Sequence, residues 1–169
     1  MQRLILLRHG KTEAVSASGA DIDRGLTDRG RRDCGVMAHR LADAGLAPTL
    51  ALVSSARRAR ETWGLLAPSF PGARLKLEPS LYLASAERIA ELAELAAGSE
   101  PEGRLIVVGH NPGLHELAWS LAARDHGPVK ERLEAGFPTA AAAVFGRPAN
   151  GRWSLERLMT PRDAEEGRD

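Results

Sequence analysis

The sequence predicts an α/β fold, a three-layer α/β/α sandwich with a mostly parallel central sheet and an antiparallel hairpin at its C-terminal edge. Three observations lead to this prediction. Short runs of apolar residues recur along the chain, which is typical of strands that are covered on both faces. Segments with helical periodicity separate these runs, so strands and helices alternate as they do in parallel sheets. Two strand candidates then follow each other directly near the C-terminal end, which predicts the hairpin.

The parallel strands are expected where the apolar runs lie. Residues 4–7, 50–53 and 105–108 are continuous apolar runs, and residues 74–77 form a short candidate with a weaker signal. A continuous run has no polar side that would face solvent, so it suits a strand that is buried between two layers of helices. These four segments are therefore the predicted parallel strands.

Four helices are expected between or after these strands. Thr27 is a suitable N-cap for the first helix, which runs to about Leu41. The second helix follows residue 55 and ends near Leu66. Ser85 is a suitable N-cap for the third helix, and the fourth begins near Leu114. The predicted apolar sides consist of Val36, Met37, Ala38, Leu41 and Ala42 in the first helix, and of Ile89, Leu92 and Leu95 in the third.

The hairpin completes one domain. Its strands are expected at residues 140–145 and 153–158, because the sequence Pro-Ala-Asn-Gly at residues 148–151 favours a turn between them. A chain of 169 residues has the usual length of one α/β domain. We therefore expect a single domain over residues 1–160, followed by a charged and frayed tail at residues 161–169.

Charge and composition exclude several classes of protein. The 23 basic and 22 acidic residues leave a net charge of +1. Proteins that bind nucleic acid nonspecifically usually have a strongly basic face, and this balance of charges does not suggest one. Cys34 is the single cysteine, so the chain forms no internal disulfide. No apolar run approaches the roughly 18 residues of a membrane span. We therefore expect no nucleic-acid or membrane partner and a cytoplasmic location, whereas a monomer and a dimer both stay open.

Polar clusters follow three of the predicted strands. Arg8-His9-Gly10 follows the first, Ser54-Ser55 with Arg57 and Arg58 follows the second, and Gly109-His110-Asn111 follows the run at residues 105–108. Ligands of open α/β sheets bind at the carboxyl ends of the strands. The three clusters are therefore expected to form one site.

Two histidines and several arginines at one sheet edge predict a site for phosphoryl transfer. Arginines stabilise charge on the phosphoryl oxygens, and a neutral histidine nitrogen is a recognised nucleophile. Adjacent guanidinium groups disfavour imidazolium, so His9 should stay neutral and nucleophilic near pH 7. We expect a phosphohistidine intermediate and no requirement for a metal ion or another cofactor.

These segments resemble the histidine phosphatase superfamily, whose founding members are phosphoglycerate mutases. The run Ile5 to Gly10, with Thr12 and Glu13 after it, resembles the family's RHG signature. The pattern S-x-x-x-R-A-x-x-T recurs from Ser54 to Thr62 and places the pocket arginine at Arg58. Further matches are Val108-Gly109-His110-Asn111-Pro112 and the R-x-L-T-x-x-G element that begins at Arg24. The resemblance covers about residues 3–160.

The resemblance implies specific site residues. His9 would be the phosphorylated nucleophile, and Arg8, Arg58 and His110 would bind the phosphoryl oxygens and stabilise their transfer. Asn111 is a further candidate for substrate binding, although with the following proline it also suits a turn that opens a helix. The substrate would be a phosphorylated protein or a small phosphorylated molecule.

The general acid of many family members has no clear counterpart in this chain. Mutases and many phosphomonoesterases carry an acidic residue after the third strand, where this sequence offers Glu78 and Glu87. If neither reaches the site, the enzyme suits leaving groups that need little acid, such as the imidazole of phosphohistidine. The short chain and the missing acid resemble the small phosphohistidine phosphatases of the SixA type. Dephosphorylation of phosphohistidine on proteins is therefore the leading hypothesis.

Other interpretations compete with this one. A small-molecule phosphomonoesterase of the same superfamily would require Glu78 or Glu87 near the leaving group, and a noncatalytic phosphate binder would not require His9. Cys34 and Arg40 have the C-x5-R spacing of cysteine-dependent phosphatases, but the residues between them suit an amphipathic helix and not a glycine-rich loop. Three further histidines lack a partner motif and are expected to be structural or exposed: His39, His115 and His126.

Overall fold

The computed structural model describes residues 1–163 and confirms the predicted α/β sandwich. One sheet holds the six strands in the order β3-β2-β4-β1-β5-β6. The strands are β1 (Gln2–Arg8), β2 (Leu50–Ser54), β3 (Arg74–Glu78), β4 (Arg104–Gly109), β5 (Ala142–Arg147) and β6 (Ser154–Met159). The helices are α1 (Asp28–Asp43), α2 (Arg57–Leu66), α3 (Ala86–Ser99), α4 (Gly113–Leu121) and α5 (Pro128–Ala135), with short 3-10 turns η1 (Asp21–Asp23), η2 (Ala67–Ser69) and η3 (Pro79–Leu81).

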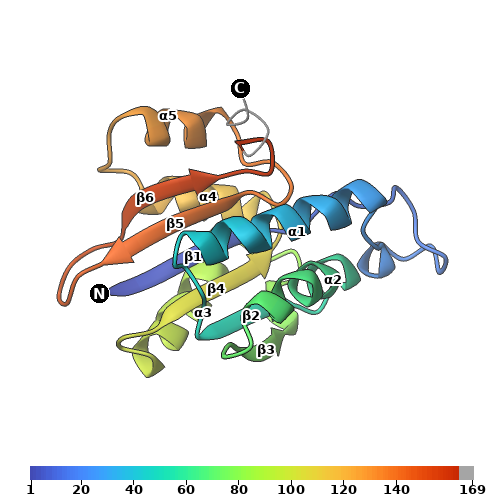
Figure 1. The fold of residues 1–169 in the computed structure, drawn as a ribbon, viewed down its shortest axis with the longest axis horizontal. Coiled ribbons are helices and arrows are strands. Elements are labelled where there is room, and N and C mark those ends of the chain that lie inside the picture. Colours follow the sequence, from blue (N-terminus) through green and yellow to red (C-terminus); the bar gives the residue numbers. More distant parts are fainter. Residues whose placement is uncertain (164–169) are drawn as a thin grey trace.

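The sheet is parallel over four strands and antiparallel at one edge. The parallel pairs are β1 with β4, β4 with β2, and β2 with β3. β5 lies antiparallel beside β1, and β6 lies antiparallel beside β5, which confirms the predicted hairpin. Helices α1 and α2 cover one face of the sheet, and α3, α4 and α5 cover the other (Figure 1).

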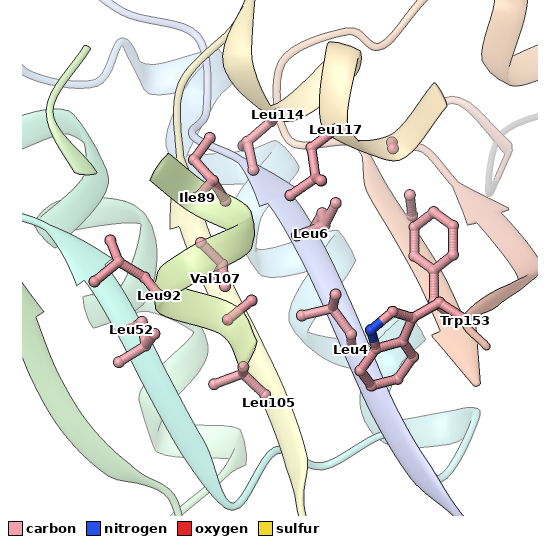
Figure 2. Packing of buried hydrophobic residues seen from close by; sticks show 14 of the residues in the cluster. Leu4, Leu6, Leu52, Ile89, Leu92, Leu105, Val107, Leu114, Leu117 and Trp153 are labelled. Carbon is pink, nitrogen blue, oxygen red and sulfur yellow. The ribbon is translucent and has the colours of Figure 1, made fainter. Parts of the chain in front are cut away.

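Strand β1 contributes to both halves of the core, because successive side chains of a strand point to opposite faces. Leu4 and Leu6 pack with residues of α3 and α4, whereas Ile5 and Leu7 pack with residues of α1 and α2. Figure 2 shows the first half, where leucines of the strands face those of the two helices. Each buried side chain of this size contributes roughly 1.5–3 kcal/mol, so β1 anchors the two layers of helices to one strand.

In two helices the buried residues differ from those that the sequence predicts. In α3 the buried side consists of Ile89, Leu92, Ala93 and Ala97. Leu95, which the sequence places on the same side, is 74% exposed, so that prediction is wrong. Leu95 lies six residues after Ile89, which is about 240° around a helix with 3.6 residues per turn. In α1 the predicted apolar residue Ala42 is exposed, because it lies beside the buried stripe that ends at Leu41.

One helix has no counterpart in the sequence prediction. Helix α5 has eight residues and carries only two large apolar side chains, Val129 and Leu133, which is too few to define a period. Leu133 is buried in the half of the core that α3 and α4 cover, and this contact holds α5 against the domain.

The predicted tail begins with residues that contact the domain. Asp163 accepts hydrogen bonds from Arg132 Nη2 at 3.0 Å and from the amide of Thr160 at 2.9 Å, and Arg40 pairs with the same carboxylate. The rest of the predicted tail, residues 164–169, lies outside the described residues. Over residues 1–163, no helix has the length and the apolar character that crossing a membrane requires.

Three adjacent strands bring the polar clusters to one edge of the sheet. β4 lies between β1 and β2, and Arg8 at the end of β1 pairs with Gly109 at the end of β4. β2 ends at a similar level, at Ser54. His9 and His110, each the first residue after its strand, therefore leave the sheet side by side.

The first turn of α1 packs against the loop that follows His9. Thr27 caps the helix by accepting the amide N–H of Gly30 at 3.0 Å, and its own amide donates to the carbonyl of Lys11 at 2.9 Å. A Cβ atom at Gly30 would clash with that carbonyl, so only glycine fits at this contact. By contrast, a Cβ atom at Gly35 in the same helix meets no heavy atom within 4 Å.

Two glycine-to-alanine substitutions in α1 should therefore have opposite effects on stability. Gly30→Ala should lower the free energy of unfolding by about 1–3 kcal/mol, because the helix must move away from Lys11. Gly35→Ala should raise it by about 1 kcal/mol, because alanine has the higher helix propensity and nothing obstructs its methyl group. Urea unfolding followed by circular dichroism measures both values. Equal effects of the two substitutions would show that the contact at Lys11 does not constrain the helix.

Candidate active site

His9 presents one ring nitrogen to the site. The side chain is 7% exposed, and its Nδ1 lies 2.8 Å from the carbonyl oxygen of Gly10. A carbonyl only accepts hydrogen bonds, so Nδ1 carries the proton and the lone pair lies on Nε2. The loop that starts at the end of β1 thus fixes the tautomer that a nucleophile at Nε2 requires.

His9 is neutral at ordinary pH. Burial lowers its pKa to about 4, and the charges of Arg58, Arg8 and Arg24 act in the same direction. The hydrogen bond to Gly10 opposes this shift but does not cancel it. The sequence-based expectation of a neutral imidazole thus agrees with the structure, although burial contributes more to the shift than the arginines do.

His110 lies beside His9 with its ring tilted, and the two ring centroids are 5.2 Å apart. Its Nε2 lies 2.7 Å from the hydroxyl of Ser54, which itself accepts the amide N–H of Ala56 at 3.3 Å. The Ser54 hydroxyl has its proton available for Nε2, and with that bond the ring hydrogen of His110 lies on Nδ1. This Nδ1 is buried and has no hydrogen-bond partner in residues 1–163, so it is free to donate to an oxyanion.

The environment of His110 also keeps its ring neutral. The pKa of His110 is lowered to about 3, mostly by burial and in addition by the neighbouring His9 and Arg58. A neutral ring still donates through Nδ1–H. Both histidines thus lie in a pocket where cationic arginines, and not imidazolium groups, supply the positive charge.

Arg58 is held in place by the helix on which it lies. The side chain is 5% exposed and belongs to the first turn of α2. One turn later, the Thr62 hydroxyl donates to the carbonyl of Arg58 at 2.7 Å and accepts the amide N–H of Gly10 at 3.0 Å. A single buried hydroxyl thus joins the arginine-bearing helix to the loop that carries His9. Arg57 and Arg60 of the same helix are exposed.

Arg8 and Asn111 share one backbone acceptor. Arg8 Nη1 donates to the carbonyl of Phe137 at 3.2 Å, and Asn111 Nδ2 donates to the same oxygen at 2.9 Å. Arg8 Nε and Asn111 Oδ1 are buried, and neither atom has a hydrogen-bond partner within residues 1–163. The segment before β5 thus orients both side chains, and it leaves Nε of Arg8 available to a ligand.

Two residues that the sequence analysis does not single out complete the site. Asp21 in η1 receives hydrogen bonds from Arg58 Nη2 at 3.0 Å, from Tyr82 Oη at 2.6 Å and from Arg24 Nη1 at 3.1 Å. Its backbone carbonyl also accepts from Arg58 Nη1 at 2.8 Å. The Tyr82 ring lies edge-on to His110, with centroids 5.7 Å apart. A polar loop carries no periodic signal, so only the folded chain reveals Asp21 beside Arg58.

The carboxylate of Asp21 is ionised. Its hydrogen bond from Tyr82 lowers its pKa most, and the hydrogen bond and charge of Arg58 lower it further. The same contact raises the pKa of the Tyr82 phenol. Asp21 is thus a fixed negative charge beside two arginines, with 47% of its side chain exposed at the mouth of the site.

Glu78 and Glu87 make other contacts. Glu78 accepts from the Ser80 hydroxyl at 2.8 Å and pairs with Lys76, and these contacts lower its pKa. Glu87 is exposed in the first turn of α3. Over residues 1–163, neither carboxylate forms a hydrogen bond or an ion pair with the two histidines or with Arg58.

Cys34 and the remaining histidines contribute no reactive group to this site. Cys34 is buried inside α1, and burial raises the pKa of its thiol to about 11, so the thiolate of a cysteine phosphatase does not form. His39 and His126 are exposed, and His115 bonds the carbonyl of Leu133. The described part of the chain contains no group of three or more histidine, cysteine, aspartate or glutamate side chains that could bind a metal ion.

The assembled site has a defined chemical capacity. A neutral imidazole presents Nε2, a second imidazole presents a hydrogen-bond donor, and two arginines add positive charge. Nucleophile, oxyanion donors and cationic charge are the parts that phosphoryl transfer to a side chain requires. The ionised Asp21 adds an acceptor at the mouth of the same pocket.

Comparison with known proteins leads to the same chemistry. A family model described as the histidine phosphatase superfamily (branch 1) matches residues 4–83. An uncharacterised chloroplastic protein of Arabidopsis thaliana is 31% identical over 95% of this chain and 78% of its own length. An uncharacterised protein of Mycobacterium tuberculosis is 35% identical over 88% of this chain and 90% of its own length.

A solved structure extends the similarity to the whole fold. It is SixA of Agrobacterium tumefaciens, a proposed phosphohistidine phosphatase, which is 29% identical to this chain. The alignment covers 94% of this chain and 98% of that one, with a TM-score of 0.81. Matching sequence motifs, the paired histidines at the sheet edge and these relatives together show that the chain belongs to the histidine phosphatase superfamily.

Proposed function

We propose that this protein is a phosphatase that removes the phosphoryl group from phosphohistidine on proteins, through a covalent intermediate at His9. The Nε2 lone pair attacks phosphorus, while Arg8, Arg58 and Nδ1–H of His110 hold the phosphoryl oxygens. Water then attacks the phosphorus of phospho-His9, which releases inorganic phosphate and a proton and returns the ring to its neutral form. We expect neither step to need a metal ion or cofactor, because the arginines supply the positive field.

The observation that carries this proposal is the protonation state of the site. His9 is neutral with Nε2 unbonded, and the carboxyl group nearest to the pocket arginine, Asp21, is ionised. An ionised carboxylate has no proton to give to a departing alkoxide. An imidazole leaving group departs as a neutral molecule when its other ring nitrogen is protonated, so it needs no proton from the enzyme. This arrangement favours a phosphoramidate over a phosphate ester.

A relative supports phosphohistidine as the substrate, and the exposure of two residues at the site supports a substrate that is carried on a protein. SixA of Agrobacterium tumefaciens, a proposed phosphohistidine phosphatase, resembles this chain over nearly its whole length. At the mouth of the site, Asp21 is exposed and Tyr82 is half-buried. A phosphohistidine side chain that projects from a protein surface suits such an open mouth better than a small molecule that must be enclosed.

A parallel assay of wild type and His9→Ala tests the nucleophile and the substrate class. With EDTA present, the wild type should hydrolyse phosphohistidine, free and on a carrier protein, in preference to p-nitrophenyl phosphate and sugar phosphates. His9→Ala should lose about 10³-fold or more in kcat/KM, because the attacking nitrogen is absent. His39→Ala is the matched control, since it removes an exposed histidine from the same protein.

The other possible results of that assay would contradict the proposal in different ways. Preference for an ester would favour a small-molecule phosphomonoesterase with a general acid. No turnover, with phosphate bound normally by His9→Ala, would favour a noncatalytic phosphate binder. Full activity in His9→Ala would show that His9 is not the nucleophile.

The pH dependence of the reaction should reflect the buried histidine. Protonation of His9 removes the attacking lone pair, so kcat/KM should fall on the acid side with an apparent pKa near 4 and not near the 6.5 of free histidine. A pH series with p-nitrophenyl phosphate, corrected for the ionisation of that substrate, measures this limb. Imidazole carbon shifts assigned through His9→Ala provide the direct titration. Titration of His9 near 6.5 would contradict the buried, neutral state.

Removal of the Thr62 hydroxyl should damage both stability and activity. Thr62→Val keeps the shape of the side chain but leaves the buried amide of Gly10 without an acceptor, at a cost of about 1–3 kcal/mol in the free energy of unfolding. kcat/KM should fall about tenfold or more, because Arg58 and His9 lose their common anchor. Thr62→Ser retains the hydroxyl and should keep most of the activity. Equal activity of the two variants would show that the hydroxyl does not position the site.

A further inference from the structure

We infer that Asp21 recognises the leaving group: its carboxylate accepts the N–H of the distal imidazole nitrogen of the phosphohistidine substrate. This inference rests on the proposed function and adds a residue that determines its specificity. It is supported by the place of Asp21, by its remaining hydrogen-bonding capacity and by the chemistry of the bond that breaks.

The place of Asp21 follows from the direction of attack. His9 is buried beneath the site, and in-line displacement puts the leaving atom on the side of phosphorus opposite to Nε2. That side is the open mouth, where Asp21 is held against the guanidinium of Arg58 and the phenol of Tyr82. A phosphoryl group bound by Arg58 thus brings its leaving group next to the carboxylate that contacts the same arginine.

The carboxylate has room for one more donor. Oδ2 accepts from Arg58 at 3.0 Å and from Tyr82 at 2.6 Å, and Oδ1 accepts from Arg24 at 3.1 Å. Two carboxylate oxygens accept about four hydrogen bonds, so one site remains on Oδ1. Three donors from two loops and one helix hold the group in position. Because the carboxylate is already oriented, little freedom is lost when it binds a ligand.

The bond changes require a proton on the distal nitrogen. The Nε2–P bond of His9 forms as the P–N bond of the substrate breaks, and the electron pair of that bond moves onto the leaving ring nitrogen. With the distal nitrogen protonated, the departing imidazole is neutral, and the enzyme transfers no proton. A carboxylate that accepts this N–H favours the protonated and reactive form of the substrate.

The enzyme applies the same arrangement to its own histidine. Nδ1–H of His9 donates to the carbonyl of Gly10, so the ring keeps its distal proton when Nε2 carries the phosphoryl group. When water displaces His9 in the second step, His9 departs as a neutral imidazole. Asp21 thus does for the substrate ring what the Gly10 carbonyl does for the enzyme ring.

A different assignment would limit Asp21 to the positioning of Arg58. The two assignments predict different effects on different leaving groups. A positioning residue acts on the phosphoryl group that all substrates share, so its loss lowers the turnover of every substrate alike. A residue that binds the leaving group acts only on substrates that carry the N–H.

The test compares Asp21→Asn with wild type on three small substrates: phosphoimidazole, its analogue methylated on the distal nitrogen, and p-nitrophenyl phosphate. Asp21→Asn should lower the ratio of kcat/KM for phosphoimidazole to that for p-nitrophenyl phosphate about tenfold or more, as loss of a charge-assisted hydrogen bond predicts. The wild type should prefer phosphoimidazole to the methylated analogue, and Asp21→Asn should lose this preference. Asp23→Asn is the matched control, because this exposed carboxylate of the same turn bonds Ser18 and should leave the ratio unchanged.

The outcomes separate this inference from the proposed function. Parallel losses on all three substrates, or an unchanged ratio, would overturn the inference while the proposed function stands. A wild type that prefers p-nitrophenyl phosphate to phosphoimidazole would overturn the proposed function and the inference with it. If Asp21→Asn does not fold, the methylated analogue still decides with wild type alone: equal kcat/KM for the two imidazoles would overturn the inference.

Discussion

The hydroxyl of Thr62 is the contact on which the geometry of the site depends. It accepts the amide of Gly10 and donates to the carbonyl of Arg58, so it joins the loop after β1 to the first turn of α2. Glu61, the residue before it, accepts the amide of Leu26 and ties the next loop to the same helix. One helix therefore sets the distance between His9, Arg58 and the loop that carries Asp21.

Burial decides which groups in the site carry charge. Both histidines are buried beside arginines. An imidazolium charge there would lose its hydration and be repelled by the guanidinium charges, so both rings remain neutral. The positive charge of the pocket therefore stays on the guanidinium groups. A nucleophile and a hydrogen-bond donor can thus share a cationic pocket with no imidazolium present. The carbonyl of Gly10 fixes the tautomer of His9, because a carbonyl only accepts hydrogen bonds, and the Ser54 hydroxyl is the partner of His110 Nε2.

The ionised carboxylate at the mouth of the site gives the pocket two different parts. The inner part presents arginine and imidazole N–H groups, which in the proposed function hold the phosphoryl group, whereas Asp21 at the rim is an acceptor. The ester oxygen that leaves a phosphate ester carries no hydrogen, whereas the leaving ring of a protonated phosphoimidazole offers an N–H to that acceptor. Within the proposed function, the preference for a nitrogen leaving group would therefore come from the charge of the rim and not from a dedicated general acid.

The sequence by itself determined the strands and most of the helices, and it predicted that His9, Arg58 and His110 meet at one edge of the sheet, because apolar runs, capping residues and motif spacings are local properties of the chain. It misplaced Leu95, since Ile89, Leu92 and Leu95 lie at intervals of three and do not stay on one side of a helix with 3.6 residues per turn. The tertiary structure alone decided the partners of Asp21 and Tyr82, which lie 61 positions apart and meet through a hydrogen bond. It also decided the histidine tautomers and the depressed pKa values. These depend on burial and on contacts between distant segments, and such contacts leave no periodic or local pattern in a single sequence.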